Sequence, residues 1–286
     1  MNRSVNRAGV LYVVATPIGN LQDISARALE VLKAVSLVAA EDTRHSKKLL
    51  AHYGIGTALQ SVHEHNEREV TDRLVQKLTA GADIALVSDA GTPLISDPGF
   101  HLVRSARQAG IRVVPVPGPS ALIAALSVAG LPTDRFVFAG FLPSRQAARQ
   151  LRLQGLAAET ATLVLYESSH RIVDCLADMA DAFGGDREAT LARELTKTFE
   201  TVLTGTLTDL LGQLQADLHQ QKGEFVVMVR GASPRDRGEI DVASERVLAV
   251  LLSELPLKQA AALAAGITGL SKNVLYEQGL KLKNKR

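Results

Sequence analysis

Residues 83–99, DIALVSDAGTPLISDPG, constrain the fold of this chain more than any other part of its sequence. Residues 84–87 form a short apolar run, partly β-branched, which predicts a buried strand. The run ends in a loop of small, polar and ring side chains at 88–93, and a second turn at 97–99 leads into a helical pattern. Open α/β sheets bind ligands at the carboxyl ends of strands, where a Gly/Pro loop exposes backbone N–H and C=O groups. A single loop of this kind also fits an ordinary structural turn.

Two further predicted strands end in similar loops. Residues 10–15 (VLYVVA) open into the loop 16–20 (TPIGN), and residues 111–116 lead into the loop 115–121 (PVPGPSA). Strands alternate with helical patterns in this half, which predicts a mainly parallel sheet with helices on both faces. We therefore expect the three loops to line one crevice through their backbone atoms, with few carboxylates there apart from Asp89.

The second half of the chain predicts a mixed sheet, because short steps such as that from Arg193 to Glu200 favour antiparallel pairs. The predicted strands are residues 136–141, 162–166, 190–193, 200–203 and 224–229. We expect an α/β protein with a parallel-sheet domain at 1–117, a mixed-sheet domain at 118–232 and a small helical unit at 240–286. A polar linker at 231–238 precedes that unit.

The C-terminal segment has the pattern of a helix-turn-helix unit. Residues 256–265 predict one helix, residues 266–270 a turn, and Ser271 the cap of the next helix. Residues 271–286 carry five lysine or arginine residues, including Lys272, and one glutamate. This charge suits a phosphate backbone, although a frayed basic terminus gives the same pattern.

Composition excludes several classes of protein. Of the 286 residues, 46% are apolar and 22% charged, and the N-terminus has no signal-peptide pattern. No apolar run approaches the roughly 20 residues that span a bilayer. The single cysteine, Cys175, excludes disulfides within the chain, so we expect a cytoplasmic protein. The net charge is only +2, so a nucleic acid would have to be bound by local patches.

Common phosphate, dinucleotide and nucleophile motifs are absent from the sequence. It has no GxxxxGKS or GxxxxGKT loop, no strand-linked GxGxxG and no GxSxG elbow. His63 and His65 have a spacing that could ligate a metal from one face of a strand. No cysteine or carboxylate pattern completes such a site, and we expect no metal.

Seven segments, in this order, resemble the tetrapyrrole (corrin/porphyrin) methylase superfamily: LYVVATPIGNLQDIS, AAEDTR, SDAGTPLISDPG, VPVPGPSA, YESSHR, ARELTKTFE and KGEFVVMV. The chain is most similar to the branch that methylates the 2′-hydroxyl of a cytidine in the decoding region of 16S rRNA. The resemblance covers nearly the whole chain. It implies S-adenosylmethionine bound between two α/β domains, a homodimer, and 16S rRNA in the small ribosomal subunit as the substrate. Ser169 departs from the family, which commonly has proline there.

The resemblance also implies which residues bind the cofactor. The first loop would form the floor of the site, the other two would contact the cofactor, and the second sheet would close over it. The expected cofactor-binding residues are Thr16, Pro17, Gly19, Asp89, Gly91, Thr92, Ile95, Ser120, Ala121, Leu165, Tyr166, Ala192 and Arg193. Plain packing is the alternative role for Ile95 and Ala121.

Methyl transfer to a ribose hydroxyl needs the two reactants in line and a group that removes the hydroxyl proton. The expected candidates for this base are Glu167, His170 and Glu200, with Asp89 and Glu194 as further carboxylates. Each could instead be a structural partner of Arg171 or Arg193.

Cationic side chains predict the RNA-binding surface. Arg145, Arg149 and Arg152 fall at i, i+4 and i+7, so a helix would carry them as one stripe or merely as a solvated face. The expected RNA contacts are Arg44, Lys47, Lys48, Arg145, Arg149, Arg152, Arg171 and Lys272. Two other functions stay open: a tetrapyrrole (precorrin) C-methyltransferase, which would not need these cations, and a non-enzymatic RNA-binding protein that uses only the tail.

Overall fold

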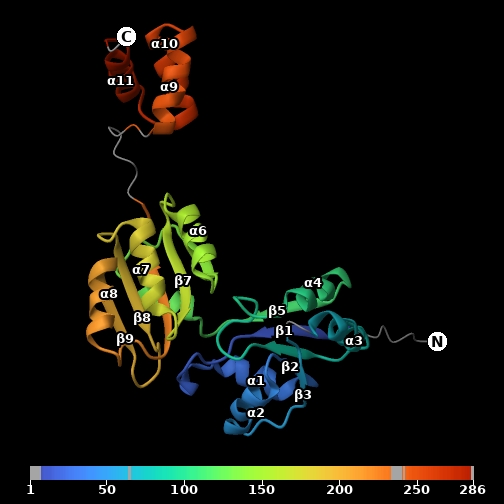
Figure 1. The fold of residues 1–286 in the computed structure, drawn as a ribbon. Helices are drawn as coiled ribbons and strands as arrows, with labels where there is room; N and C mark the ends of the chain where they lie inside the picture. Colours follow the sequence, from blue (N-terminus) through green and yellow to red (C-terminus); the bar gives the residue numbers. More distant parts are fainter. Residues whose placement is uncertain (1–7, 64–65, 233–239, 241, 285–286) are drawn as a thin grey trace, which may run out of the picture. The chain divides into compact units, whose positions relative to one another are not determined.

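The structure is a computed structural model that describes residues 8–63, 66–232, 240 and 242–284. The chain divides into two compact units, the first comprising Met1–Ala157 and Ala161–Arg230 and the second Ala158–Thr160 and Gly231–Arg286. The first unit contains two β-sheets, and the second contains the C-terminal helices (Figure 1). Within the described residues, no helix is both long and apolar enough to span a bilayer.

The first sheet is parallel throughout, as the alternation of strands and helical patterns predicts. Its strands are β1 (Val10–Val14), β2 (Leu37–Ala40), β3 (Leu59–Ser61), β4 (Ile84–Val87) and β5 (Arg112–Val116). Their spatial order is β3-β2-β4-β1-β5, so β1 lies between β4 and β5. The loops that follow these three strands therefore leave the sheet side by side at one edge.

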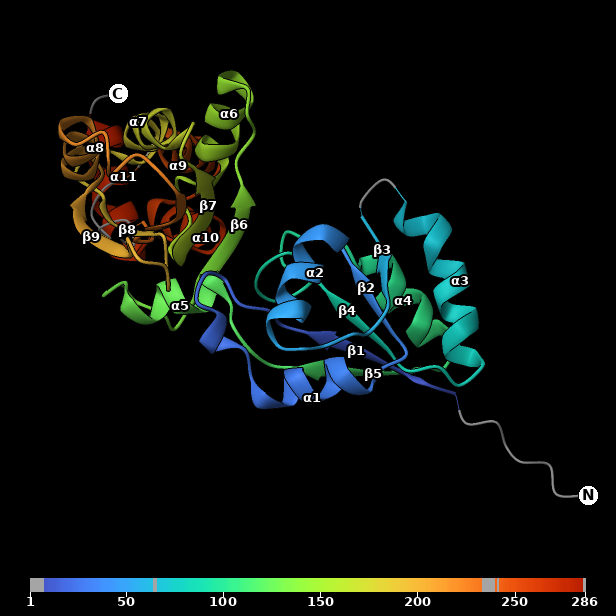
Figure 2. The ribbon, with the colours of Figure 1, turned by 90° about the horizontal axis from the view of Figure 1, so that it is seen from below.

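Helices cover both faces of this sheet, because side chains alternate between the faces along each strand. In β4, Ile84 and Leu86 pack into a core with α3 (Glu67–Thr79) and α4 (Phe100–Gln108). Ala85 and Val87 of the same strand pack into a core with α1 (Ala26–Ala34) and α2 (Thr43–His52). Figure 2 shows α2 and α3 on opposite sides of β3.

The sequence pattern does not predict α2 and β3. Asp42 caps α2 by accepting a hydrogen bond from the Arg44 backbone N–H at 2.8 Å, and only Ser46 and Leu50 of this helix are buried. Such a narrow buried face has little apolar periodicity by which to recognise a helix. β3 ends at Ser61, so His63 lies beyond it, and His65 lies outside the described residues.

The second sheet is mixed, as predicted, in the order β6-β7-β10-β8-β9. Its strands are β6 (Phe136–Phe141), β7 (Thr162–Ser168), β8 (Glu188–Arg193), β9 (Thr201–Thr206) and β10 (Glu224–Val229). Only β6 and β7 are parallel neighbours in this sheet. One face packs against α6 (Gln146–Leu156), α7 (Ile172–Phe183) and α8 (Leu207–Ala216). The opposite face packs against α5 (Ala121–Val128).

The second unit contains α9 (Val242–Glu254), α10 (Leu257–Thr268) and α11 (Lys272–Asn284), packed around Leu248, Ala261 and Leu275. The turn expected at 266–270 is shorter in the structure, because α10 continues to Thr268 and Gly269 ends it in the left-handed conformation (φ 72°). A glycine inside a helix costs only about 1 kcal/mol, so Gly266 does not end the helix. The expected linker lies outside the described residues except for 231 and 232, and the domain limits at 117, 232 and 240 stay predictions.

A buried ion pair joins α6 to α7. The Arg149 Nε donates to Asp178 Oδ2 at 2.6 Å, and the two side chains are 5% and 3% exposed. Burial alone would raise the pKa of Asp178. Hydrogen bonds from Arg149, Gln146 and Gln150 outweigh this effect, so the pKa lies below its ordinary value. Arg145 and Arg152 are exposed, but Arg149 is not. Arg149 is therefore no part of an exposed basic stripe, and its expected contact with RNA is corrected.

We predict that Arg149→Met destabilises the protein by about 3 kcal/mol, because it leaves Asp178 buried without its cation. Chemical denaturation measures the loss, and Arg152→Met on the same helix is the control, with an expected change within about 0.5 kcal/mol. Equal stability of the two variants would contradict the structural role of the ion pair.

Candidate active site

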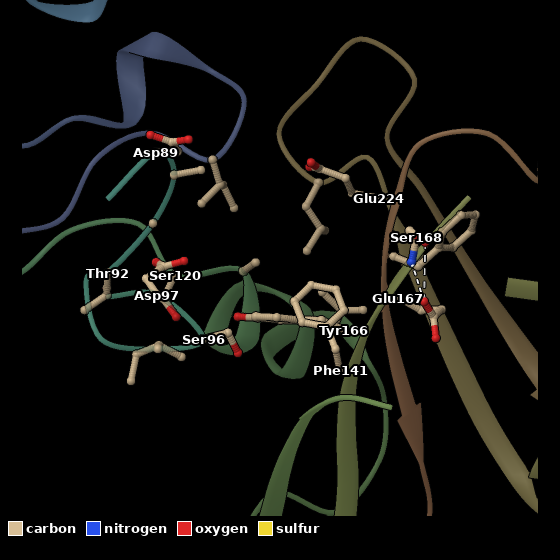
Figure 3. Close-up of a pocket in the computed structure, with 18 of the residues that line it drawn as sticks. Asp89, Thr92, Ser96, Asp97, Ser120, Phe141, Tyr166, Glu167, Ser168 and Glu224 are labelled. Carbon is tan, nitrogen blue, oxygen red and sulfur yellow. Dashed lines mark hydrogen bonds between the residues drawn. The ribbon is translucent and has the colours of Figure 1, made fainter. Parts of the chain in front are cut away.

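A pocket of about 360 Å³ lies between the loops of the first sheet and the second sheet (Figure 3). The loops after β1, β2 and β4 line it on one side. Residues of β6, β7 and β10, together with the loop after β8, line it on the other, and the start of α5 adds Ser120 and Ala121. Its volume lies in the range of small-molecule sites, roughly 300 to 1,000 Å³.

The three Gly/Pro loops of the first sheet are bonded to one another. Thr16 N donates to Gly91 O at 2.9 Å, and Gly91 N donates back to Thr16 O at 3.0 Å. The Thr92 hydroxyl donates to Pro119 O at 3.1 Å, which connects the second loop to the third. The loops thus form one continuous wall, as the strand-end argument predicts.

The structure brings many of the expected cofactor-binding residues to this pocket, but not all. Those that line it are Asp89, Gly91, Thr92, Ile95, Ser120, Ala121, Tyr166 and Ala192. Thr16 and Pro17 are buried beneath the pocket wall, where the Thr16 hydroxyl donates to Ser88 O at 3.2 Å. Contact between each of these residues and a cofactor stays a prediction.

Alternation along β7 and β8 explains why two expected residues do not line the pocket. Tyr166 and Ala192 belong to the sheet face that carries α5 and the pocket. Leu165 points to the other face, into the core with α6, α7 and α8. Arg193 is also turned away, and its guanidinium donates to the backbone oxygens of Lys222, Phe199 and His219. These contacts give Leu165 and Arg193 structural roles.

The loop after β4 is held in a strained conformation. Leu94 and Ser96 are non-glycine residues at positive φ, 73° and 69°, which costs of order 1–3 kcal/mol each. The loop is fixed at its far end by Glu67, a buried residue of α3. Its Oε1 accepts hydrogen bonds from the backbone N–H groups of Gly99, His101 and Leu102 at 3.1, 2.7 and 3.2 Å. Glu67 therefore caps the start of α4 and stabilises the loop that precedes it.

A second strained loop, residues 194–200, closes the pocket from the other sheet. Glu194 and Thr196 have φ of 50° and 65°, and Lys197 Nζ lies 2.8 Å from carboxylate oxygens of both Glu194 and Glu224. Asn20 N donates to the Thr196 hydroxyl at 3.0 Å. A Cβ at Gly19 would lie 2.5 Å from Lys197 Cγ, so glycine is required for this close approach. Gly19 therefore joins the two loops without lining the pocket itself.

The pocket is more acidic than the sequence suggests. The expectation of few carboxylates apart from Asp89 is wrong, because Glu41, Asp97 and Glu224 also line it. Burial and the neighbouring carboxylates Asp97 and Asp89 raise the pKa of Glu41. Burial raises the pKa of Asp97 to about 6, with Asp89 adding to the effect and hydrogen bonding by Ser88 opposing it. These carboxylates belong to segments that are far apart in the sequence and meet only in the folded chain.

The three expected bases lie in different surroundings. The Glu167 side chain is 1% exposed, and its carboxylate accepts hydrogen bonds from Arg171 and from Ser168 N, on the side of β7 away from Asp89 and Asp97 (Figure 3). His170 and Glu200 are exposed and do not line the pocket. Glu200 accepts a hydrogen bond from Thr196 N at 2.6 Å and lines a second depression beside Arg193. Of the three, only Glu167 belongs to the pocket lining, and its carboxylate is turned away from the pocket and bound to Arg171.

The expected RNA contacts also divide into exposed and engaged side chains. Lys47 and Lys48 are exposed on α2, and Lys272 is exposed on α11. Arg44 is also exposed, but its guanidinium is paired with Asp42 at 2.7 Å. Arg171 is one-quarter exposed and bound to Glu167, so it is held by the second sheet. No group of three or more histidine, cysteine, aspartate or glutamate side chains is placed to hold a metal in the part of the chain that the structure describes.

Sequence reasoning missed several residues of the pocket. They are Ile18, Glu41, Ala90, Ser96, Asp97, Phe141, Ser168, Leu195, Lys197, Glu224, Phe225 and Val226. Asp97 and Lys197 lie inside two of the segments that resemble the family, SDAGTPLISDPG and ARELTKTFE. That resemblance was the one indication in the sequence that these two residues belong to the site. Their placement depends on contacts between distant segments.

The chain is similar to known proteins over nearly its whole length. Residues 10–211 match the Tetrapyrrole (Corrin/Porphyrin) Methylases, and residues 238–283 match the RsmI C-terminal HTH domain. The Ribosomal RNA small subunit methyltransferase I of Pseudomonas aeruginosa is 60% identical over 97% of this chain and 99% of the relative. The protein of that name from Escherichia coli O157:H7 is 53% identical over 96% of both chains.

Solved structures share the fold of the two sheets. The uroporphyrin-III-C-methyltransferase from Thermus thermophilus has a TM-score of 0.56 and 23% identity, covering 78% of this chain and 94% of its own. A diphthine synthase has a TM-score of 0.59 and 17% identity, covering 78% of this chain and 90% of its own. At these identities the likeness concerns the fold alone.

We predict that Glu67→Ala lowers the free energy of unfolding by about 3 kcal/mol, because three backbone N–H groups lose a buried charged acceptor. Amide hydrogen exchange at residues 99–102 should accelerate more than exchange in the strands. Glu69→Ala is the control, because Glu69 lies on the same helix with a side chain that is 74% exposed. Unchanged exchange at 99–102 would contradict the role assigned to Glu67.

Proposed function

Because the chain belongs to the tetrapyrrole (corrin/porphyrin) methylase family, we propose that it transfers a methyl group from S-adenosylmethionine to a cytidine 2′-hydroxyl in the decoding region of 16S rRNA. The observation that carries the proposal is the 50–60% identity to proteins named Ribosomal RNA small subunit methyltransferase I, over 94–98% of this chain. That similarity includes the C-terminal unit, which the tetrapyrrole methylase match does not cover.

The pocket fits a cationic nucleoside cofactor. Ile18, Ile95, Phe141, Tyr166 and Val226 offer apolar surface of the kind that accommodates a purine. The carboxylates of Glu41, Asp89 and Glu224 surround the same space, and Lys197 is the single lysine or arginine in its lining among the described residues. A sulfonium and an ammonium group are favoured by such a negative lining. When bound, S-adenosylmethionine supplies the electrophilic methyl group.

The protein's contribution to methyl transfer is positioning. The strained loops after β4 and β8 hold the pocket wall in one arrangement, and fixed geometry of this kind lowers the barrier of a reaction between two bound partners. The Tyr166 hydroxyl accepts a hydrogen bond from Leu122 N at 3.1 Å, which fixes its ring against α5 and beneath the pocket. Val164 and Met228 are fully buried in the core against which the ring packs, and they exclude water from that side.

Two groups of cations support an RNA substrate. α2 begins two residues after Glu41, which lines the pocket, and carries the exposed Arg44, Lys47 and Lys48. In the second unit, α11 carries Lys272, Lys281 and Lys283. Cations of this kind neutralise phosphates and supply much of the affinity for a nucleic acid. A tetrapyrrole substrate would have no use for either group, so the observations favour RNA.

We further propose the assembled small ribosomal subunit as the substrate, a homodimer as the active form, and the cytoplasm as the place of action. Exposed apolar side chains on α5 and β6 outside the pocket support a partner surface, since Ile123 and Phe136 are 55% and 41% exposed. Light scattering of the purified protein measures the oligomeric state.

We predict that the protein transfers tritiated methyl groups to 16S rRNA in small subunits that lack this modification. Nuclease digestion and mass spectrometry should identify 2′-O-methylcytidine as the product. Label in a precorrin but none in rRNA would favour the alternative, a tetrapyrrole C-methyltransferase. Absence of S-adenosylmethionine binding in calorimetry would favour a non-enzymatic RNA-binding protein.

Charge reversal on α2 tests the role of its cations in RNA binding, and charge reversal on α3 is the matched control. Lys47→Glu with Lys48→Glu should raise the KM for rRNA by about tenfold or more, and should lower the salt dependence of binding by about one phosphate contact per residue. Arg73→Glu with Lys77→Glu places the same charge change on α3, across the sheet, and should have little effect. S-adenosylmethionine affinity should be the same in both variants.

A further inference from the structure

The carboxylates that line the pocket differ in how strongly other groups hold them. Arg171 binds Glu167, and Lys197 binds Glu224, in ion pairs of 2.7 and 2.8 Å. Asp89 Oδ1 accepts a hydrogen bond from Asp42 N at 3.0 Å, and the Glu41 carboxylate accepts one from the Asp89 backbone. Asp89 and Glu41 form no ion pair with a described residue, but each is held by a fixed backbone N–H group. Among the described residues, neither a cation nor a backbone N–H group binds Asp97, whose one partner is the Ser88 hydroxyl, a donor that can rotate away. Asp97 is therefore the pocket carboxylate most available to a substrate.

The position of Asp97 is fixed even though its carboxylate is available. It follows Ser96, whose φ is 69°, and precedes by two residues Gly99, whose N–H is bound to Glu67 at 3.1 Å. Figure 3 shows Asp97 beside Thr92, Ser96 and Ser120, on the opposite side of the pocket from Glu167. A general base needs such a fixed position within reach of the hydroxyl that it deprotonates.

We propose that Asp97 is the general base of the reaction, a proposal that rests on the function proposed above. Its carboxylate takes the proton of the attacking ribose hydroxyl. In the same step a bond forms between the ribose oxygen and the methyl carbon, and the bond between that carbon and the sulfonium sulfur breaks. The electron pair of the broken bond stays on sulfur, which leaves as a neutral thioether, and the proton ends on Asp97.

The surroundings of Asp97 adapt it to this task. Burial and the Asp89 carboxylate raise its pKa from 3.8 to about 6, against the effect of Ser88. Glu41 and Tyr166 also act electrostatically on Asp97, and Glu167, Glu224 and Lys197 line the same pocket. A base is most effective with a pKa near the operating pH, where it is ionised and still accepts a proton readily. Activity should therefore fall as the pH drops through about 6.

The same shift distinguishes a catalytic from a structural role. An acid whose pKa is higher in the folded protein than in the unfolded chain binds protons more readily when folded. The ionised group then makes the fold less stable as the pH rises from 3.8 to about 6. Asp97→Asn removes that cost, so at higher pH the variant should melt at the same temperature as the wild type or higher. A carboxylate kept only for structure would give the opposite result.

The experiment measures the single-turnover rate of methyl transfer to small subunits lacking the modification. Asp97→Asn should lower that rate by about 100-fold or more, which is the usual contribution of a general base. S-adenosylmethionine affinity, measured by calorimetry, should stay within about threefold of wild type. The wild-type rate should fall at acidic pH, and the residual rate of the variant should lose that dependence.

One control and three possible results decide the outcome. Asp72→Asn removes an exposed carboxylate on α3 and should leave the rate unchanged. If the wild type is active and Asp97→Asn transfers methyl groups at nearly the same rate, Asp97 is not the general base. The proposed function would still stand. A loss of S-adenosylmethionine affinity that accounts for the whole effect would also overturn the role of Asp97 as the base, because Asp97 would then be a binding residue. A wild type that transfers no methyl to rRNA would overturn both proposals.

Discussion

The parallel pairing of β4, β1 and β5 is the constraint on which the rest of the site depends. Parallel neighbours deliver their following loops to one edge, and the hydrogen bonds of 2.9 and 3.0 Å between Thr16 and Gly91 join two of these loops directly. The second sheet supplies the opposite wall through strand alternation. Tyr166 faces the pocket, whereas its neighbours Leu165 and Glu167 face the helices on the other side.

Strain in this protein is concentrated at the pocket. In the described part of the chain, the non-glycine residues at positive φ are Leu94, Ser96, Glu194 and Thr196, and all lie in the two loops that close the pocket. Such conformations persist only where the surroundings determine them. Glu67 does so for the first loop, and the ion pairs of Lys197 do so for the second. The helix cap made by Glu67 and the ion pairs of Lys197 thus hold the two strained loops, and these loops give the pocket a fixed shape.

Much of this fold could be predicted from local patterns. The apolar runs at 84–87 and 10–14 and the Gly/Pro loops after them mark the strands and the edge at which a ligand binds. Local patterns do not show whether a charged side chain is buried in an ion pair, exposed to solvent or part of the pocket. Arg149 has the spacing of an exposed stripe, but it is buried in an ion pair with Asp178 of α7. Asp97 and Lys197 lie in recognisable segments, but their meeting across the pocket depends on how the two sheets pack.

The central claim is that the loops of the first sheet and the face of the second sheet that carries α5 together hold S-adenosylmethionine. A crystal structure with S-adenosylhomocysteine bound tests it most directly. The account predicts electron density for that molecule in the pocket, in contact with the loop after β4, with Ser120 and with Tyr166. Density in the separate depression beside Arg193 and His219, with this pocket empty, would contradict it.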